Sequence, residues 1–229
     1  MTVERTPAIG FKLRSLSFAE FTGKLVWTEP QKTNGDLIMK NIIEKTRTFR
    51  KFDATAVIDA STVEKLIELG RLGGSARNCQ PWQYRIVTDA GECASVFPHL
   101  GWAGYLTDWK GPEERQRPTA YILCYLNREW LKGSLQEAHF DLGIASQNML
   151  LGATEAGLGG CRILAFSKKL AAEFPQPEHL ELQLVIALGV PAEKVVIEEC
   201  SDYNIKYWRD GNQTHHVPKR RLQDILLQP

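Results

Sequence analysis

Apolar side chains recur three and four positions apart in several stretches of this sequence, which is the spacing of one face of a helix. The pattern runs over residues 36–46, after a turn-forming Asn-Gly-Asp, and again over residues 61–69, before Gly70. A third stretch, residues 91–108, carries aromatic residues at comparable spacing. Small polar residues before a helix and glycine after it are typical of helix ends. The pattern therefore predicts helices over these three ranges.

The longest predicted helix covers residues 134–156, and it is apolar on most of its faces. A helix that is apolar all round is a buried one. Small side chains allow a second helix to approach closely, and this stretch contains Ala138, Gly143, Ala145, Ser146, Gly152 and Ala153. We therefore expect a long, buried central helix that lies at a dimer interface.

Other apolar stretches are better explained as strands. Residues 83–88 alternate and are rich in β-branched side chains, and residues 119–126 form a continuous apolar run. Shorter apolar runs cover residues 161–164 and 181–188, with a short helical stretch at 167–173 between them. Lengths of four to eight residues favour strands over helices.

Two further strand-like segments, 205–209 and 214–217, flank Asp210-Gly211-Asn212, which is a good hairpin signal. Because a hairpin breaks the strand–helix–strand alternation, we expect an α+β fold: a central mixed, mostly antiparallel sheet flanked by helices. Residues 1–35 lack a clear period and are interpreted as an N-terminal extension, so the domain proper is expected to be residues 36–229.

Composition places the chain among ordinary globular proteins. It has 229 residues, of which 43% are hydrophobic and 24% charged, and its net charge is +1. That balance argues against nucleic acid or a membrane surface as partner. No apolar run reaches the roughly 18 residues of a membrane span, and the N-terminus lacks the apolar core of a signal peptide. We expect a cytoplasmic protein.

Common catalytic motifs are missing from the sequence. The five cysteines include no CxxC pair, so no metal site is expected, and buried reduced thiols are the simplest interpretation. The glycine-rich residues 157–160 follow a predicted helix and precede a strand, the reverse of a dinucleotide-binding fingerprint. No spacing supports a Ser-His-Asp arrangement. Chemistry would more plausibly come from a cofactor.

Cationic residues gather near both ends of the predicted domain. Arg47 and Arg50 lie three positions apart with Thr48 between them, and Lys219 and Arg221 alternate near the C-terminus. Guanidinium groups bind phosphate bidentately, and lysine adds a point charge. The spacing alone is also compatible with solvated basic surfaces. If the two clusters meet, they would hold a phosphorylated ligand.

Together with these clusters, two further motifs resemble the nitroreductase family of FMN-dependent oxidoreductases. The most specific is Ser75-Ala76-Arg77-Asn78-Cys79-Gln80-Pro81-Trp82, which resembles the family's Ser-x-x-Asn-x-Gln-Pro-Trp. The basic stretch 47–52 and the C-terminal Pro-Lys-Arg-Arg-Leu at 218–222 resemble its terminal motifs. Residues 141–163 resemble its long helix, Gly-Leu-Gly and strand. Four motifs occur in the family's order, over roughly residues 36–229.

The resemblance implies roles for particular residues. The FMN phosphate would be held by Arg47, Thr48, Arg50, Lys219 and Arg221, and the ribityl chain and flavin edge would meet Ser75, Arg77, Asn78 and Gln80. The strand end at Leu164 and Ala165 would present a backbone N–H toward flavin N5. The chain departs from the family at Thr46, where a basic residue is usual. Loss of that contact would weaken phosphate binding by about 1.5–3 kcal/mol unless another group replaces it.

A substrate lid is expected over the segment that contains Trp102, Tyr105 and Trp109. The resemblance places this segment where family members vary and shape substrate access. Aromatic residues at such spacing are, on pattern alone, more often part of a hydrophobic core, so that alternative stays open.

The function implied by the resemblance is that of a homodimeric, FMN-dependent NAD(P)H oxidoreductase. A second copy of the chain, NADH or NADPH and a small electron acceptor, such as a nitroaromatic or a quinone, would be its partners, in a ping-pong reaction through flavin N5. Three alternatives remain: a reductive dehalogenase or flavin-processing relative on the same scaffold, a non-catalytic FMN-binding protein, and a helical interaction module without flavin.

Overall fold

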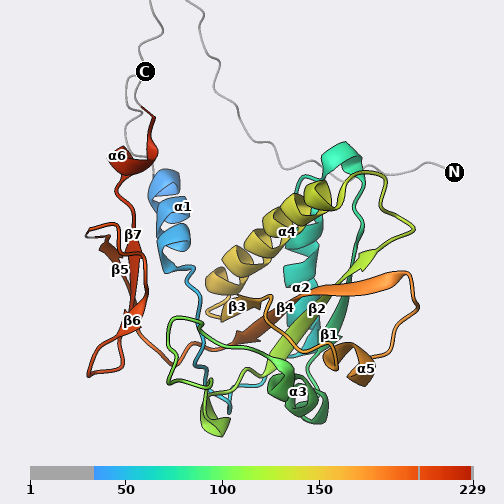
Figure 1. Cartoon of the computed structure of the whole chain (residues 1–229), viewed down its shortest axis with the longest axis horizontal. Coiled ribbons are helices and arrows are strands. Elements are labelled where there is room, and N and C mark those ends of the chain that lie inside the picture. The colour runs from blue at the N-terminus through green and yellow to red at the C-terminus, as the bar shows by residue number, and fades with distance from the viewer. Residues whose placement is uncertain (1–33, 201, 228–229) are drawn as a thin grey trace, which may run out of the picture.

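The structure, a computed structural model, describes residues 34–200 and 202–227 (Figure 1). The expected N-terminal extension, residues 1–35, lies almost wholly outside the described residues. The domain that follows combines a four-stranded central sheet, helices on both of its faces and a smaller three-stranded sheet formed near the C-terminus. This is the α+β architecture that the sequence predicts.

The central sheet has the strand order β1-β2-β4-β3, and every neighbouring pair is antiparallel. Its strands are β1 (Trp82–Val87), β2 (Ala120–Asn127), β3 (Gly159–Ile163) and β4 (Leu180–Gly189). Strand β2 is buried at every position, because it pairs on both edges and is covered on both faces. This explains why its sequence is a continuous apolar run rather than an alternating one.

The two faces of β2 contribute to two hydrophobic cores. Ile122 and Leu126 point toward the helices α2 (Ala60–Arg71) and α4 (Leu135–Glu155). Tyr121 and Leu123 point to the opposite side, toward α3 (Ala90–Val96) and α5 (Leu170–Glu173). Figure 1 shows α2 and α4 on one side of the sheet and α3 and α5 on the other. Helix α1 (Asn34–Lys45) contacts α4 from outside the sheet.

Side-chain caps begin the helices at positions that local sequence specifies. Ser134 and Glu137 form a reciprocal capping box at the start of α4, and the carboxylates of Asp59 and Asp89 accept backbone N–H groups at the starts of α2 and α3. Such caps typically stabilise a helix by about 1 kcal/mol each.

One face of α4 is exposed in the single chain. Phe140 and Ile144 are 66% and 45% exposed, and Gly143 lies between them. The sequence predicts a helix that is buried on all faces. Within one chain, only the faces of α4 toward the sheet and α2 are buried.

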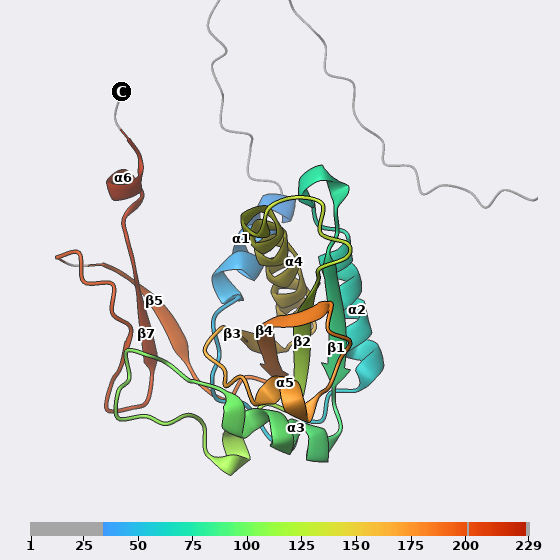
Figure 2. The ribbon, with the colours of Figure 1, turned by 45° about the vertical axis from the view of Figure 1, so that its right-hand side comes forward.

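The second sheet has the order β5-β7-β6 and stands to one side of the central sheet (Figure 2). Its strands are β5 (Val195–Glu199), β6 (Trp208–Arg209) and β7 (His215–Lys219), followed by α6 (Leu222–Ile225). The antiparallel β6–β7 hairpin confirms the turn prediction at residues 210–212. The parallel pairing of β5 with β7 was not predicted.

The predicted helix over residues 91–108 is wrong. Helix α3 ends at Val96 and continues only as a short 3₁₀ turn, Phe97–His99. Pro98 has no backbone N–H to donate, and the chain then pairs Leu100 with Phe166 in an isolated bridge. Residues 101–113 contain no helix or strand, and two more 3₁₀ turns cover Ala76–Asn78 and Glu114–Gln116.

Candidate functional site

The loop between α2 and β1 has an unusual backbone. Arg77, Asn78 and Gln80 have φ angles of 55°, 51° and 50°, in the left-handed region that residues other than glycine rarely adopt. Each such residue costs of order 1 kcal/mol or more, so the surrounding contacts must hold the loop in place. These three residues belong to the motif that most specifically predicts a ligand site.

Asp141 on α4 supplies those contacts. Its carboxylate accepts the hydroxyl of Ser75 at 2.6 Å and the backbone N–H of Ala76 at 2.9 Å, and the residue is only 6% exposed. The Ser75 hydroxyl in turn accepts the backbone N–H of Gln80 at 2.9 Å. The Gln80 amide donates to Oδ1 of Asn78 at 2.9 Å. One buried carboxylate therefore organises the predicted Ser, Asn and Gln side chains into a single unit.

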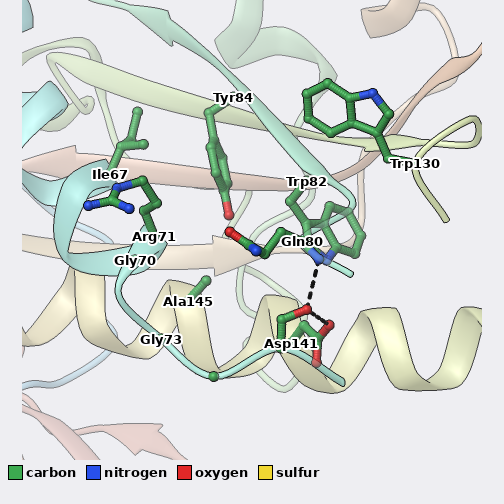
Figure 3. A pocket seen from close by; sticks show the side chains of 12 residues that line it. Ile67, Gly70, Arg71, Gly73, Gln80, Trp82, Tyr84, Trp130, Asp141 and Ala145 are labelled. Carbon is green, nitrogen blue, oxygen red and sulfur yellow. Dashed lines mark hydrogen bonds between the residues drawn. The ribbon is translucent and has the colours of Figure 1, made fainter. Parts of the chain in front are cut away.

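This loop borders a cavity of about 320 Å³ between α2, β1 and α4 (Figure 3). Its walls are mainly apolar, with Ile67, Trp82 and Tyr84 among them, and its polar groups come from Ser75, Gln80, Arg71 and Asp141. The indole Nε1 of Trp82 donates to the Ala138 carbonyl at 2.9 Å, which fixes the ring. Burial raises the pKa of Tyr84, so its phenol stays protonated. A largely apolar cavity with a few oriented polar groups suits a small organic ligand.

Arg77 is directed away from this unit. Its guanidinium donates to Glu137 at 3.1 Å on the surface, and the side chain is 64% exposed. The pKa of Glu137 is lowered mainly by its hydrogen bond from the backbone N–H of Ser134 and to a smaller extent by Arg77. In the described chain Arg77 therefore pairs with the start of α4.

The N-terminal cationic residues lie beside β3 and the second sheet. Arg47 donates to the Ile43 carbonyl at 2.6 Å, and burial lowers its pKa. Thr48 forms an isolated bridge with Gly160 of β3, and its side chain is exposed. Thr46, where the family motif is usually basic, donates to the Ile42 carbonyl and shares a hydrogen bond of 2.9 Å with Thr154 of α4.

Arg50 reaches the C-terminal hairpin instead of open solvent. Its Nη1 lies 3.2 Å from Nε2 of His215, and its guanidinium carbon lies 4.9 Å from the centre of the Tyr207 ring. A guanidinium only donates hydrogen bonds, so Nε2 of His215 is the acceptor and the imidazole is neutral. Burial, reinforced by Arg50 and Arg209, lowers the pKa of His215 to about 4.

The C-terminal cationic residues lie farther along β7. Lys219 ends the strand, and Arg221 is clamped by the Asp224 carboxylate at 3.0 Å through both Nε and Nη2. With a rise of about 3.3 Å per residue, the Cα atoms of His215 and Lys219 are about 13 Å apart. Within one chain, the described contacts thus place Arg50 at the start of β7 and Arg221 beyond its end.

Leu164 and Ala165 follow β3 and meet the start of the expected lid. Leu164 is 75% exposed, and the Ala165 carbonyl accepts the backbone N–H of Gly101 at 2.6 Å. The strand end is thereby tied to the segment that carries the three aromatic lid candidates.

The lid candidates contact the body of the protein at three places. Trp102 packs against Phe97, with ring centres 5.9 Å apart. Tyr105 is half exposed, and its ring centre lies 4.9 Å from that of Tyr207. The guanidinium carbon of Arg209 lies 4.1 Å from the centre of the Trp109 ring. Tyr105 and Trp109 are outside the two main cores, which argues against the core alternative for them.

An ion pair that sequence reasoning missed anchors this region. Arg209 donates to Glu193 at 2.9 Å, and the two side chains are only 8% and 2% exposed. Glu193 also accepts the backbone N–H groups of Arg50 and Lys51. Burial lowers the pKa of Arg209, and Glu193 opposes that shift. No local sequence pattern could reveal this pair, because Glu193 lies in the loop before β5 and Arg209 lies in β6, 16 residues later.

Acidification should destabilise the fold through His215. An unfolded histidine gains its proton near pH 6.5, whereas the folded residue stays neutral down to about pH 4. Since the unfolded state then binds more protons, stability falls with falling pH, by about 1–2 kcal/mol between pH 7 and pH 5. Urea unfolding at both pH values measures this loss. The loss of stability between pH 7 and pH 5 should be smaller in His215→Gln than in the parent. His139→Gln, a change at an exposed position, should show the parental loss. A loss in His215→Gln as large as the parent's would contradict the assignment.

The buried thiols lack the character of nucleophiles. Burial raises the pKa of Cys93 and of Cys161 to about 11, and it also raises the pKa of Cys124. In the described part of the chain no group of three or more His, Cys, Asp and Glu side chains could hold a metal ion. Nor is any helix of that part both long and apolar enough to cross a membrane.

Comparison with known proteins agrees with this fold and motif set. Residues 43–191 match the Nitroreductase family, and the chain belongs to that family. A relative from Methanothermobacter thermautotrophicus, named "Putative NADH dehydrogenase/NAD(P)H nitroreductase", is 27% identical over 184 residues, and the match covers 74% of this chain and 90% of the relative.

Solved structures show the same fold. A nitroreductase family protein from Streptococcus pneumoniae matches with a TM-score of 0.60 and 17% identity, over 83% of this chain and all of that one. A "putative nitroreductase in complex with FMN" from Desulfovibrio desulfuricans matches with a TM-score of 0.59 and 23% identity, over 83% of this chain and 95% of that one. The resemblance inferred from the four sequence motifs is therefore confirmed at the level of family and fold.

Proposed function

We propose that this protein is an FMN-dependent NAD(P)H oxidoreductase that reduces small conjugated electrophiles such as nitroaromatics or quinones. The observation that carries the proposal is the strained Ser75–Gln80 loop, which a buried Asp141 holds at the mouth of a cavity. When bound, FMN accepts and donates hydride at N5, which supports a ping-pong exchange between the two substrates. Family membership and the FMN complex of the D. desulfuricans protein support the cofactor assignment.

The residues present suit this cofactor. Asn78 and Gln80 are exposed at the loop and offer both amide donors and acceptors, as ribityl hydroxyls and the flavin edge require. Arg47, Thr48, Arg50, Lys219 and Arg221 are proposed to bind the phosphate. Since one chain keeps Arg50 and Arg221 at different ends of β7, we propose that a second copy completes the set. Leu164 and Ala165 are proposed to border flavin N5.

A homodimer is part of this proposal, with the exposed face of α4 as its interface. Phe140 and Ile144 give that face an apolar character, and a Cβ at Gly143 would meet no atom within 4 Å in the single chain. A cytoplasmic location, and the absence of nucleic-acid and membrane partners, stay predictions.

An absorbance spectrum of the purified protein tests the cofactor, and anaerobic NADPH or NADH tests the activity. We expect a flavin band at roughly 450 nm that bleaches with the nucleotide and returns when a quinone is added. Flavin that binds but never bleaches would favour a non-catalytic FMN-binding protein. A colourless protein that also fails to bind added FMN would overturn the proposal.

Lys219→Ala and Arg221→Ala should each weaken FMN binding by about tenfold or more, because each removes a charged phosphate contact of about 1.5–3 kcal/mol. Titration of the cofactor-free protein by flavin fluorescence measures this. Lys206→Ala, a change at an exposed lysine outside the proposed set, is the matched control. Unchanged affinity in both variants would refute the phosphate assignment.

Gly143→Leu should leave the single chain folded and weaken the dimer. The position is open within one chain, so a leucine clashes only if a second helix packs there. Gly152→Leu is the informative contrast, since its Cβ would already meet Leu69 of α2 within the same chain. Analytical ultracentrifugation separates the two effects. A Gly143→Leu protein that sediments as the parent does would exclude this part of α4 from the interface.

A further inference from the structure

The irregular residues 101–113, here termed the lid segment, depend on contacts with other elements for their position. They contain no helix or strand, and Ala103 has a φ of 41°. Figures 1 and 2 show the segment (green) extending from the region after α3 toward the second sheet. Near its start, Gly101 donates to the Ala165 carbonyl and Trp102 packs against Phe97. Farther along, Tyr105 and Trp109 contact residues 207 and 209.

Tyr207 makes two different contacts with the lid segment. Its hydroxyl accepts the backbone N–H of Tyr105 at 3.3 Å, and its ring lies 4.9 Å from that of Tyr105, tilted by 49°. The tilted geometry is one that aromatic pairs prefer, and such pairs contribute beyond simple area burial. The hydrogen bond fixes the lid backbone itself, whatever side chain residue 105 carries.

Tyr207 also faces the N-terminal basic motif. The guanidinium of Arg50 lies 4.9 Å from the Tyr207 ring centre, and the His215 ring lies 5.2 Å away. Arg50 is itself held by the hydrogen bond to His215. Tyr207 thus separates the lid segment from one of the cations assigned above to the cofactor phosphate.

A second anchor lies two residues farther along. The Arg209 guanidinium stacks on Trp109 at 4.1 Å, and its Nη2 donates to Glu193 at 2.9 Å. Because Glu193 also accepts the backbone N–H groups of Arg50 and Lys51, the anchor and the basic motif share one carboxylate. Residues 207 and 209 together fasten the lid segment at two points.

We propose that Tyr207 is a positioning residue that holds the lid segment against the C-terminal hairpin and, through Arg50, couples the position of the lid to cofactor binding. The coupling rests on the proposed function, whereas the anchoring does not. Since the lid is expected to shape substrate access, loss of the Tyr207–Tyr105 contact is expected to change the acceptor KM more than kcat.

Tryptic cleavage after Lys110 measures the anchoring without any cofactor. Lys110 is an exposed residue of the lid segment, followed by Gly111. Cleavage there reports the fraction of molecules whose lid has opened. In cofactor-free protein, Tyr207→Leu should accelerate cleavage by about tenfold, the effect of a 1.4 kcal/mol shift in the opening equilibrium. Tyr203→Leu is the matched control, since Tyr203 is 75% exposed and lies outside these lid contacts.

Tyr207→Phe gives an independent readout that retains the ring. It removes only the hydroxyl, so the Tyr105 amide should lose its protection in hydrogen exchange while neighbouring strands keep theirs. The anchoring is overturned if Tyr207→Leu is cleaved at the parental rate, if Tyr203→Leu is accelerated equally, or if Tyr105 stays protected in Tyr207→Phe.

The coupling is tested by repeating the cleavage with saturating FMN. Bound FMN should slow cleavage at Lys110 severalfold in the parent and much less in Tyr207→Leu. The same slowing in both proteins would overturn the coupling. Failure of FMN to bind at all, seen in its fluorescence, would instead refute the proposed function and the coupling that depends on it, and the cofactor-free result would still decide the anchoring.

Discussion

Asp141→Ala is expected to lower FMN affinity by about a hundredfold and the free energy of unfolding by about 2–4 kcal/mol. The carboxylate accepts two hydrogen bonds from the loop that carries Ser75 and Gln80, and bonds to a charged group contribute about 1.5–3 kcal/mol each. Without them the left-handed residues of the loop lose the contacts that offset their strain. Flavin fluorescence titration and urea unfolding measure the two effects.

Asp141→Asn separates charge from shape. Asparagine keeps the volume and one acceptor oxygen, so we expect an intermediate loss of both affinity and stability. Glu155→Ala is a suitable control, because Glu155 ends the same helix and is exposed. Parental FMN affinity in a folded Asp141→Ala protein would show that the loop does not take part in cofactor binding.

Arg209→Met is expected to destabilise the protein by about 3 kcal/mol. The change leaves Glu193, whose side chain is 2% exposed, as a buried carboxylate without its ion-pair partner, and breaking a buried pair by removing one member is strongly unfavourable. Glu193 keeps the N–H groups of Arg50 and Lys51, which places the loss at the lower end of the usual range. A fall in the urea midpoint with an unchanged slope measures it.

Two further variants identify the cause. In the double variant Arg209→Met with Glu193→Gln, removal of the buried charge should recover part of the stability, because the amide oxygen can still accept the two N–H groups. Arg128→Met removes a pair with Glu181 in which both side chains are 46% exposed, and it should cost less than about 1 kcal/mol. Equal losses in Arg209→Met and Arg128→Met would contradict a special role for the buried pair.

Most of the regular elements could be predicted from the sequence because their signals are local. The long helix α4 and the buried strand β2 follow from long, largely apolar stretches of the sequence, and Ser134 marks the helix start through its cap. The prediction of a helix over residues 91–108 was wrong because Pro98 lacks a backbone N–H and Leu100 pairs with Phe166, 66 residues later in the chain. Strand β5 was not predicted, because it is stabilised by parallel pairing with β7, about 20 residues later in the chain.

Part of the candidate site could likewise be predicted from local sequence, and part of it could not. The Ser-x-x-Asn-x-Gln-Pro-Trp motif pointed to the loop, and the structure brings its Ser, Asn and Gln side chains together. Arg77 was grouped with them but pairs with Glu137, since a left-handed backbone turns its side chain toward α4. The described contacts within one chain do not bring Arg50 together with Lys219 and Arg221, and their convergence stays part of the dimer proposal.

By itself the sequence determined the family, the class of fold and the loop that carries the candidate site, because periodicity, caps and motifs are written in neighbouring residues. Only the tertiary structure decided that Asp141 holds this loop, that Glu193 pairs with Arg209, and that Tyr207 contacts both Arg50 and the lid segment. Those pairs join elements distant along the chain. Their meeting depends on how helices and strands pack, which no local spacing specifies.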